Sequence, residues 1–68
     1  MARYANYFEI GENAAEFVLG FGQSYSESEE VQIHTRIVTS PLYAKALLHL
    51  LEESIKRHEQ TCGEIYEE

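Results

Sequence analysis

The chain has 68 residues, of which 12 are acidic and five are basic lysines or arginines, so its formal net charge at pH 7 is −7. This balance argues against the positive surface that nucleic-acid binding requires, and against attraction to an anionic membrane. No apolar run approaches the ~20 residues of a membrane-spanning helix, and the opening MARYANYFEI lacks the layout of a signal peptide. We therefore expect a cytoplasmic protein that binds no membrane and for which nucleic acid is the less favoured partner.

The small size of the chain predicts a single domain, residues 1–68, that needs some additional source of stability. Cys62 is the one cysteine, which excludes an internal disulfide and fits a reducing compartment. The ligands for a structural zinc are too few. Oligomerisation remains, so we expect a homodimer. We expect no cofactor, and no interior large enough for a ligand pocket of several hundred Å3.

The first 39 residues predict three β-strands. Each candidate segment alternates large apolar side chains with polar or small ones, and turn-forming residues such as Gly11 and Asn13 separate the first two segments. The predicted strands span Tyr4–Ile10, Glu16–Gln23 and Val31–Thr39. The residues expected to face the rest of the protein are Phe8, Ile10, Phe17, Leu19, Phe21, Ile33 and Ile37.

Gly20 and Gly22 lie on the small face of the second strand and allow two interpretations. They mark a β-bulge or a close approach of two backbones. Alternatively, they leave space for an aromatic side chain of a neighbouring strand, such as Tyr7. A phosphate-binding loop is not expected, because no helix and no lysine follow these glycines.

The polar stretch Ser24–Glu30 is most simply a solvated loop between two strands. The functional alternative is a loop that is phosphorylated or attracts cations. Glu27, Glu29 and Glu30 lack the fixed ligand pattern and the turn glycine of a calcium-binding loop.

The longest periodic segment, between Ser40 and Gly63, predicts one α-helix. Ser40 is a favourable N-cap, Pro41 suits the first helical position, and Gly63 can adopt the positive φ that ends a helix. One face repeats at spacings of three and four residues. This face contains Ala44, Leu48, Leu51, Ile55, His58 and Cys62, and Tyr43, Leu47 and Leu50 widen it.

The apolar face of this helix spans roughly 160°, wider than the ~100° of an ordinary surface helix. A helix seated deeply on a small sheet would explain the width, and so would burial of part of the face against a second chain. Length favours the second explanation, because a helix of ~22 residues extends ~33 Å and an eight-residue strand only ~27 Å. We expect the helix end, around Ile55, His58 and Cys62, to overhang the sheet.

The order of the elements predicts an α+β fold, a three-stranded antiparallel β-meander followed by one long C-terminal α-helix (β-β-β-α). The helix would cross one face of the sheet, with Leu48, Leu51 and Ile55 over the apolar strand residues. The first and third strands would then be open edges, which must be protected or paired. Two chains could join through these edges or through the overhanging helices, and the sequence does not choose between them.

Several short pieces of the sequence resemble a known family. They are Tyr4-Ala5-Asn6-Tyr7, Glu16-Phe17, Phe21-Gly22-Gln23, Ser40-Pro41, Ala44-Lys45, Leu48, Leu51 and Gly63-Glu64-Ile65. Together they cover most of the chain and resemble small bacterial proteins catalogued as domain of unknown function 3467. The resemblance implies a bacterial-type cytoplasm and brings no established activity. Members often carry a polar residue in place of Tyr43 and an aromatic in place of Cys62, which implies that neither residue is catalytic.

No catalytic arrangement is visible in the sequence. His58 and Cys62 lie four residues apart on one helical face, but two ligands are too few for a metal site. The missing ligands would have to come from His34, His49, Glu59 or a second chain. If Cys62 were a nucleophile and His58 its base, the pair would lack an orienting group and an oxyanion site. We therefore expect no catalytic, cofactor-binding or metal-binding residues.

These observations predict a small non-enzymatic protein-interaction module that forms a homodimer and serves as an adaptor or accessory subunit for an unidentified protein partner. The alternative is a nucleic-acid-associated regulatory protein that uses the sheet or the helix pair of the dimer, although it would lack the usual positive groove. The residues predicted to form the interface are Tyr43, Leu47, Leu50, Ile55, His58 and Cys62.

Overall fold

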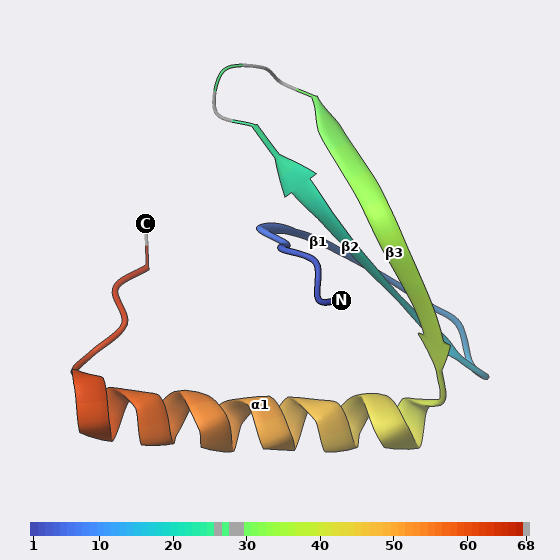
Figure 1. Ribbon diagram of the computed structural model, residues 1–68. Helices are drawn as coiled ribbons and strands as arrows, with labels where there is room; N and C mark the ends of the chain where they lie inside the picture. The colour runs from blue at the N-terminus through green and yellow to red at the C-terminus, as the bar shows by residue number, and fades with distance from the viewer. Residues whose placement is uncertain (26, 28–29, 68) are drawn as a thin grey trace.

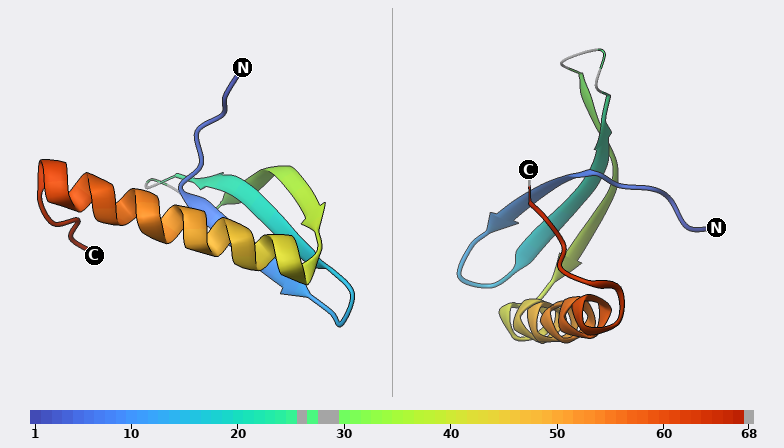
Figure 2. Two further views of the ribbon diagram at one scale, coloured as in Figure 1. Left: turned by 90° about the horizontal axis from the view of Figure 1, so that it is seen from below. Right: turned by 90° about the vertical axis from the view of Figure 1, so that its left-hand side faces the viewer.

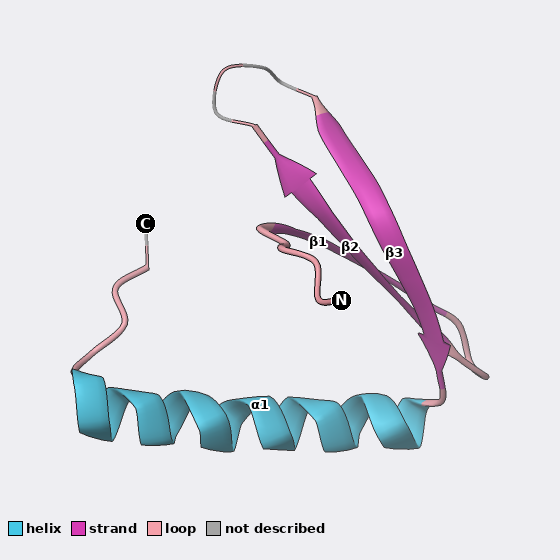
Figure 3. Cartoon of the chain, in the orientation of Figure 1, coloured by secondary structure: helices cyan, strands magenta, loops and turns pink. Residues whose placement is uncertain are grey.

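A computed structural model describes residues 1–25, 27 and 30–67, and its elements follow one another in the order β1, β2, β3, α1 (Figure 1). They span Tyr7–Glu12 (β1), Phe17–Ser24 (β2), Val31–Thr39 (β3) and Pro41–Cys62 (α1). The strands form one antiparallel sheet in the order β1-β2-β3 (Figure 3). The predicted β-β-β-α meander is therefore confirmed. The predicted loop Ser24–Glu30 lies partly outside the described residues.

β1 lies closer to the first turn than the sequence predicted. Its pairing with β2 continues through Gly11 and Glu12, because the chain reverses only at Asn13. The Asn13 side-chain oxygen accepts hydrogen bonds from the backbone N–H groups of Ala15 (2.8 Å) and Glu16 (3.0 Å). These side-chain hydrogen bonds form an Asx turn, and the Asn13 N–H also donates to the Glu16 carbonyl (3.0 Å).

The segment before β1, predicted as strand, is held by hydrogen bonds to the far end of the sheet. The Asn6 carboxamide donates to the carbonyl of Ser24 (3.1 Å) and accepts from its N–H (2.7 Å). Upstream, the carbonyl oxygen of Tyr4 lies 2.9 Å from Nε2 of His34 on β3. The segment therefore crosses from β2 to β3, as the side view shows (Figure 2).

A β-bulge interrupts the pairing of β2 with β3. Phe21 lies opposite Thr35, whereas Gly22 lies opposite Ile33, so His34 is the extra residue. A shift of one residue moves a side chain to the opposite face of the sheet. Ile33, which the sequence predicts to face the helix, therefore lies on the face of the sheet that points away from the helix. The prediction was wrong because the apolar–polar alternation of the sequence continues through the bulge without a break.

The two glycines of β2 have different surroundings. A Cβ atom at Gly22 would lie 2.9 Å from the carbonyl carbon of Gln32 and closer still to its oxygen. At Gly20 the atoms nearest to an added Cβ would belong to Glu9, at 3.6 Å, which is an ordinary van der Waals distance. Gly22 therefore marks a close backbone approach, as one interpretation predicted, and it also lies opposite Tyr7.

The ends of α1 lie where the sequence predicted them. Ser40 Oγ accepts a hydrogen bond from the Tyr43 N–H (3.2 Å), and Pro41 is the first helical residue. At the other end Gly63 has φ +93°, and its N–H donates to the Glu59 carbonyl (3.0 Å). Local capping thus determines both ends of the helix.

α1 does not lie flat on the sheet. The two layers meet at the junction of β3 with α1 and diverge from there, and the far part of the helix extends past the strands (Figures 1 and 2). In the described part of the chain no α1 residue is buried, and Leu19, 8% exposed, is the one buried large apolar side chain. The predicted core under Leu48, Leu51 and Ile55 therefore does not form within one chain. Only Ser40 links β3 to α1, so its extended capping geometry (φ −84°, ψ 161°) directs the helix away.

Candidate functional site

The angle between α1 and the sheet creates an open apolar groove with a volume of about 510 Å3. We call it the helix–sheet groove. Its lining consists of Ile10, Phe17 and Leu19 from the sheet and of Pro41, Ala44, Lys45, Leu47, Leu48 and Leu51 from α1. This volume belongs to an open groove between two elements and not to an interior pocket, so the expectation that the chain has no interior large enough for a ligand stays a prediction.

Large apolar side chains of the groove are exposed to solvent. Leu48 and Leu51 are 53% and 54% exposed, and Ile10 is 62% exposed. On the same sheet face the rings of Phe8 and Phe21 meet edge to face, with centroids 5.9 Å apart, yet Phe8 remains 59% exposed. Contiguous exposed apolar surface of this kind is typical of sites where proteins contact other molecules.

The surface area of the chain is also large for its mass. The chain exposes 6194 Å2, whereas a compact protein of 7.8 kDa exposes only ~4,400 Å2. Its radius of gyration is 14.3 Å, against about 11 Å for a compact domain of this length. If each of two chains buried its excess of about 1,800 Å2, the total would fall in the ~2,000–5,000 Å2 range of obligate dimers.

The residues predicted to form an interface all lie on α1 with exposed side chains. They are Tyr43, Leu47, Leu50, Ile55, His58 and Cys62. Leu47 lines the helix–sheet groove, whereas Tyr43 lines a shallower pocket with Val38 and Thr39. The groove also includes Leu48 and Leu51, which the periodicity assigned to the core of the single chain. Contact of the six residues with a second chain stays a prediction.

His58 and Cys62 occupy the last two turns of α1, and Cys62 is a free, exposed cysteine. Of the further ligands that a metal site would need, His34 lies in the bulge of β3. Among the residues described, no three His, Cys, Asp or Glu side chains come together. His58 and Cys62 therefore have no third ligand beside them in the part of the chain that the structure describes.

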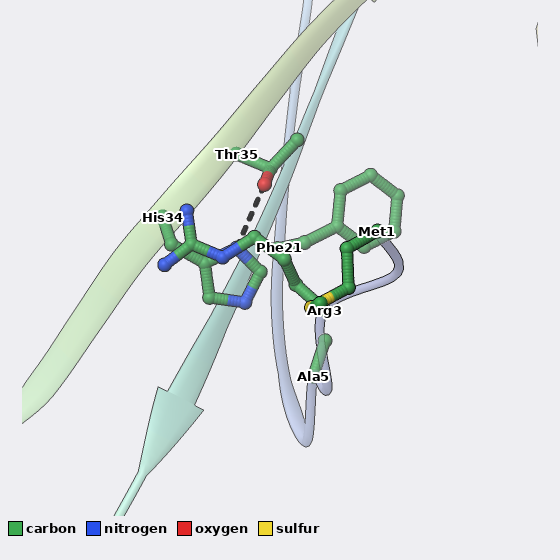
Figure 4. Close-up of a pocket in the computed structure, with 6 residues that line it drawn as sticks. All are labelled: Met1, Arg3, Ala5, Phe21, His34 and Thr35. Carbon is green, nitrogen blue, oxygen red and sulfur yellow. Dashed lines mark hydrogen bonds between the residues drawn. The ribbon is translucent and has the colours of Figure 1, made fainter.

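A smaller hollow of about 320 Å3 lies beside the N-terminal segment (Figure 4). Its lining consists of Met1, Arg3, Ala5, Phe21, His34 and Thr35. Nδ1 of His34 lies 2.7 Å from the Thr35 hydroxyl, and Nε2 lies 2.9 Å from the Tyr4 carbonyl. Since a carbonyl only accepts, Nε2 donates, and in the neutral ring Nδ1 accepts from the hydroxyl. His34 thus fastens the N-terminal segment to the sheet, a role that depends on the bulge and has no sequence motif.

No helix in the described part of the chain combines the length and the apolarity that crossing a membrane requires.

Comparison with known proteins identifies a family. The sequence matches the family described as Protein of unknown function (DUF3467) over residues 1–67. Neither the curated proteins nor the solved structures contain a match to the sequence. The family match covers the whole β-β-β-α unit, including the groove and both of its walls. The chain therefore belongs to the DUF3467 family of proteins of unknown function.

Proposed function

We propose that the protein is a small non-enzymatic protein-interaction module that forms a homodimer and serves as an adaptor or accessory subunit. The observation that carries the proposal is the helix–sheet groove, where apolar surfaces of α1 and of the sheet face each other without meeting. Burial of apolar surface stabilises an assembly by about 25 cal/mol per Å2 before the entropic cost of association. A second protein chain in the groove would gain this energy.

The shape and chemistry of the groove favour a protein over a small ligand. Small-molecule sites enclose most of the ligand and present several polar groups that fix its orientation. The helix–sheet groove is open, and Lys45 is the polar side chain of its lining. Such a surface suits the apolar side chains of a second polypeptide better than a metabolite.

An adaptor needs a further surface that stays accessible in the dimer. β1 and β3 are the outer strands of the sheet, and an outer strand can accept an extended segment of a partner. The net charge of −7 favours a partner with a basic surface and disfavours nucleic acid. The free, exposed thiol of Cys62 fits a reducing compartment, here a bacterial cytoplasm.

Sedimentation equilibrium at micromolar concentration tests the proposed homodimer. We expect the wild-type protein to sediment at twice its chain mass of 7.8 kDa. Leu51→Glu, which puts a carboxylate into the groove, should weaken association strongly because a buried unpaired charge is costly.

Leu42→Glu is the matched control, because Leu42 is 72% exposed and lies outside the groove lining. This variant should remain a dimer. A well-folded wild-type monomer would refute the homodimer, and a Leu51→Glu protein that associates as tightly as Leu42→Glu would exclude the groove as the contact surface.

A further inference from the structure

We propose that α1 of a second copy fills the helix–sheet groove, so that two antiparallel helices lie between two sheets. This inference rests on the proposed homodimer and specifies how the two chains meet. Each chain would supply one helix to its partner's groove and receive one in its own, as the self-complementary contact of a two-fold dimer requires.

The exposed surface favours this arrangement over pairing of strand edges. Edge pairing would extend the sheet sideways and leave Leu48, Leu51 and Ile10, each more than half exposed, in solvent. β1 also carries Glu9 and Glu12, so two β1 edges would bring carboxylates together. Filling the groove covers the apolar surface of both the helix and the sheet.

The width of the apolar face of α1 fits a position between two layers. Ala44, Leu48 and Leu51 line the groove, whereas Leu50 is 62% exposed and lies beyond the lining. A helix that contacts only one sheet needs a narrower apolar stripe. A helix that contacts its own sheet, a second helix and a second sheet uses the whole arc.

Charge complementarity fixes the direction and register of the helix pair. Ala44, Leu48, Leu51 and Ile55 repeat at spacings of four, three and four, the pattern of a helix–helix seam. Antiparallel packing with Leu48 beside Leu51 of the second chain places Lys45 beside Glu52 of the second chain. Lys45 is the charged residue of the groove lining, and Glu52 is exposed. The symmetry of the dimer makes this contact twice.

Charge reversal tests the register without disturbing the apolar seam. Lys45→Glu should weaken dimerisation roughly tenfold, because each of two attractive pairs becomes repulsive. The double variant Lys45→Glu/Glu52→Lys should restore the wild-type dissociation constant. Residues 45 and 52 lie about two helical turns apart in one chain, so rescue must occur between chains.

Lys56→Glu is the matched control, since it makes the same charge change at an exposed site on α1 outside the groove. Dissociation constants from sedimentation, with helicity checked by circular dichroism, give the comparison. Equal weakening by Lys45→Glu and Lys56→Glu, or no rescue by the double variant, would overturn the register and with it the helix pair.

Disulfide trapping supplies a second measurement that does not depend on charge. Chains carrying Leu48→Cys are mixed with chains carrying Leu51→Cys, both in a Cys62→Ser background. Random pairing of equal amounts places the two cysteines opposite each other in about half of the dimers, and oxidation should trap these as covalent dimers of twice the 7.8 kDa chain mass. Leu42→Cys chains should remain uncrosslinked.

The outcomes separate the two proposals. A monomeric wild-type protein would defeat both of them. A dimer that forms no Leu48→Cys to Leu51→Cys disulfide would defeat only the helix pairing and would leave strand-edge pairing as the mode of dimerisation.

Discussion

His34 shows how one extra residue changes the whole end of a sheet. As the bulged residue of β3, it shifts Ile33 to the outer face and directs its own ring toward the N-terminal segment. Both ring nitrogens of His34 are then hydrogen-bonded, one with the Tyr4 carbonyl and the other with the Thr35 hydroxyl. The bulge has no signal in the apolar–polar alternation of β3, so the sequence could not predict the side on which Ile33 lies.

Gly22→Ala tests the close approach of the backbones at the bulge. The added Cβ would collide with the Gln32 backbone, and relief would need a movement of β3. We expect a loss of about 1–3 kcal/mol in the free energy of unfolding, the usual cost of overpacking. Gly20→Ala is the control, since its Cβ would meet only ordinary contacts; it should be neutral or stabilising by about 0.4–1 kcal/mol. Equal urea midpoints for the two variants would contradict the description of the bulge.

The four elements differ in how far local sequence determines them. The bounds of β3 and α1 could be predicted, because Ser40, Pro41 and Gly63 determine the ends of the helix through local capping. The start of β1 could not, because Tyr4 looks like a strand residue but its carbonyl bonds to a side chain of β3. The sequence also could not predict the angle between α1 and the sheet, since this angle depends on the geometry of a single linking residue.

Ser40→Ala tests the local control of α1. Loss of the hydrogen bond from the Tyr43 N–H to Ser40 Oγ leaves an unpaired donor in the first turn. The free energy of unfolding should fall by about 1 kcal/mol in urea titrations. Ser40→Asp retains an acceptor oxygen and should keep most of the stability. A Ser40→Ala protein as stable as the wild type would show that capping contributes little to the helix.

At the scale of the whole molecule, the single chain leaves most of its large apolar side chains exposed. The sheet and the helix each present an apolar face, and the chain by itself buries only Leu19 among its described large apolar residues. The sequence predicted a helix longer and more widely apolar than one small sheet can cover, but it assigned Leu48 and Leu51, which are exposed, to the core of the single chain. It could not predict the groove, whose lining depends on the angle between β3 and α1. We expect folding and dimerisation to be one process, because the chain alone cannot close a core.

The dependence of the melting temperature on protein concentration tests this coupling most directly. If two chains complete one core, mass action should raise the midpoint by about 5 °C for each tenfold increase in concentration. Circular dichroism between micromolar and millimolar concentrations would measure the shift. A midpoint that stays constant across this range would show that the chain folds alone and would contradict the account.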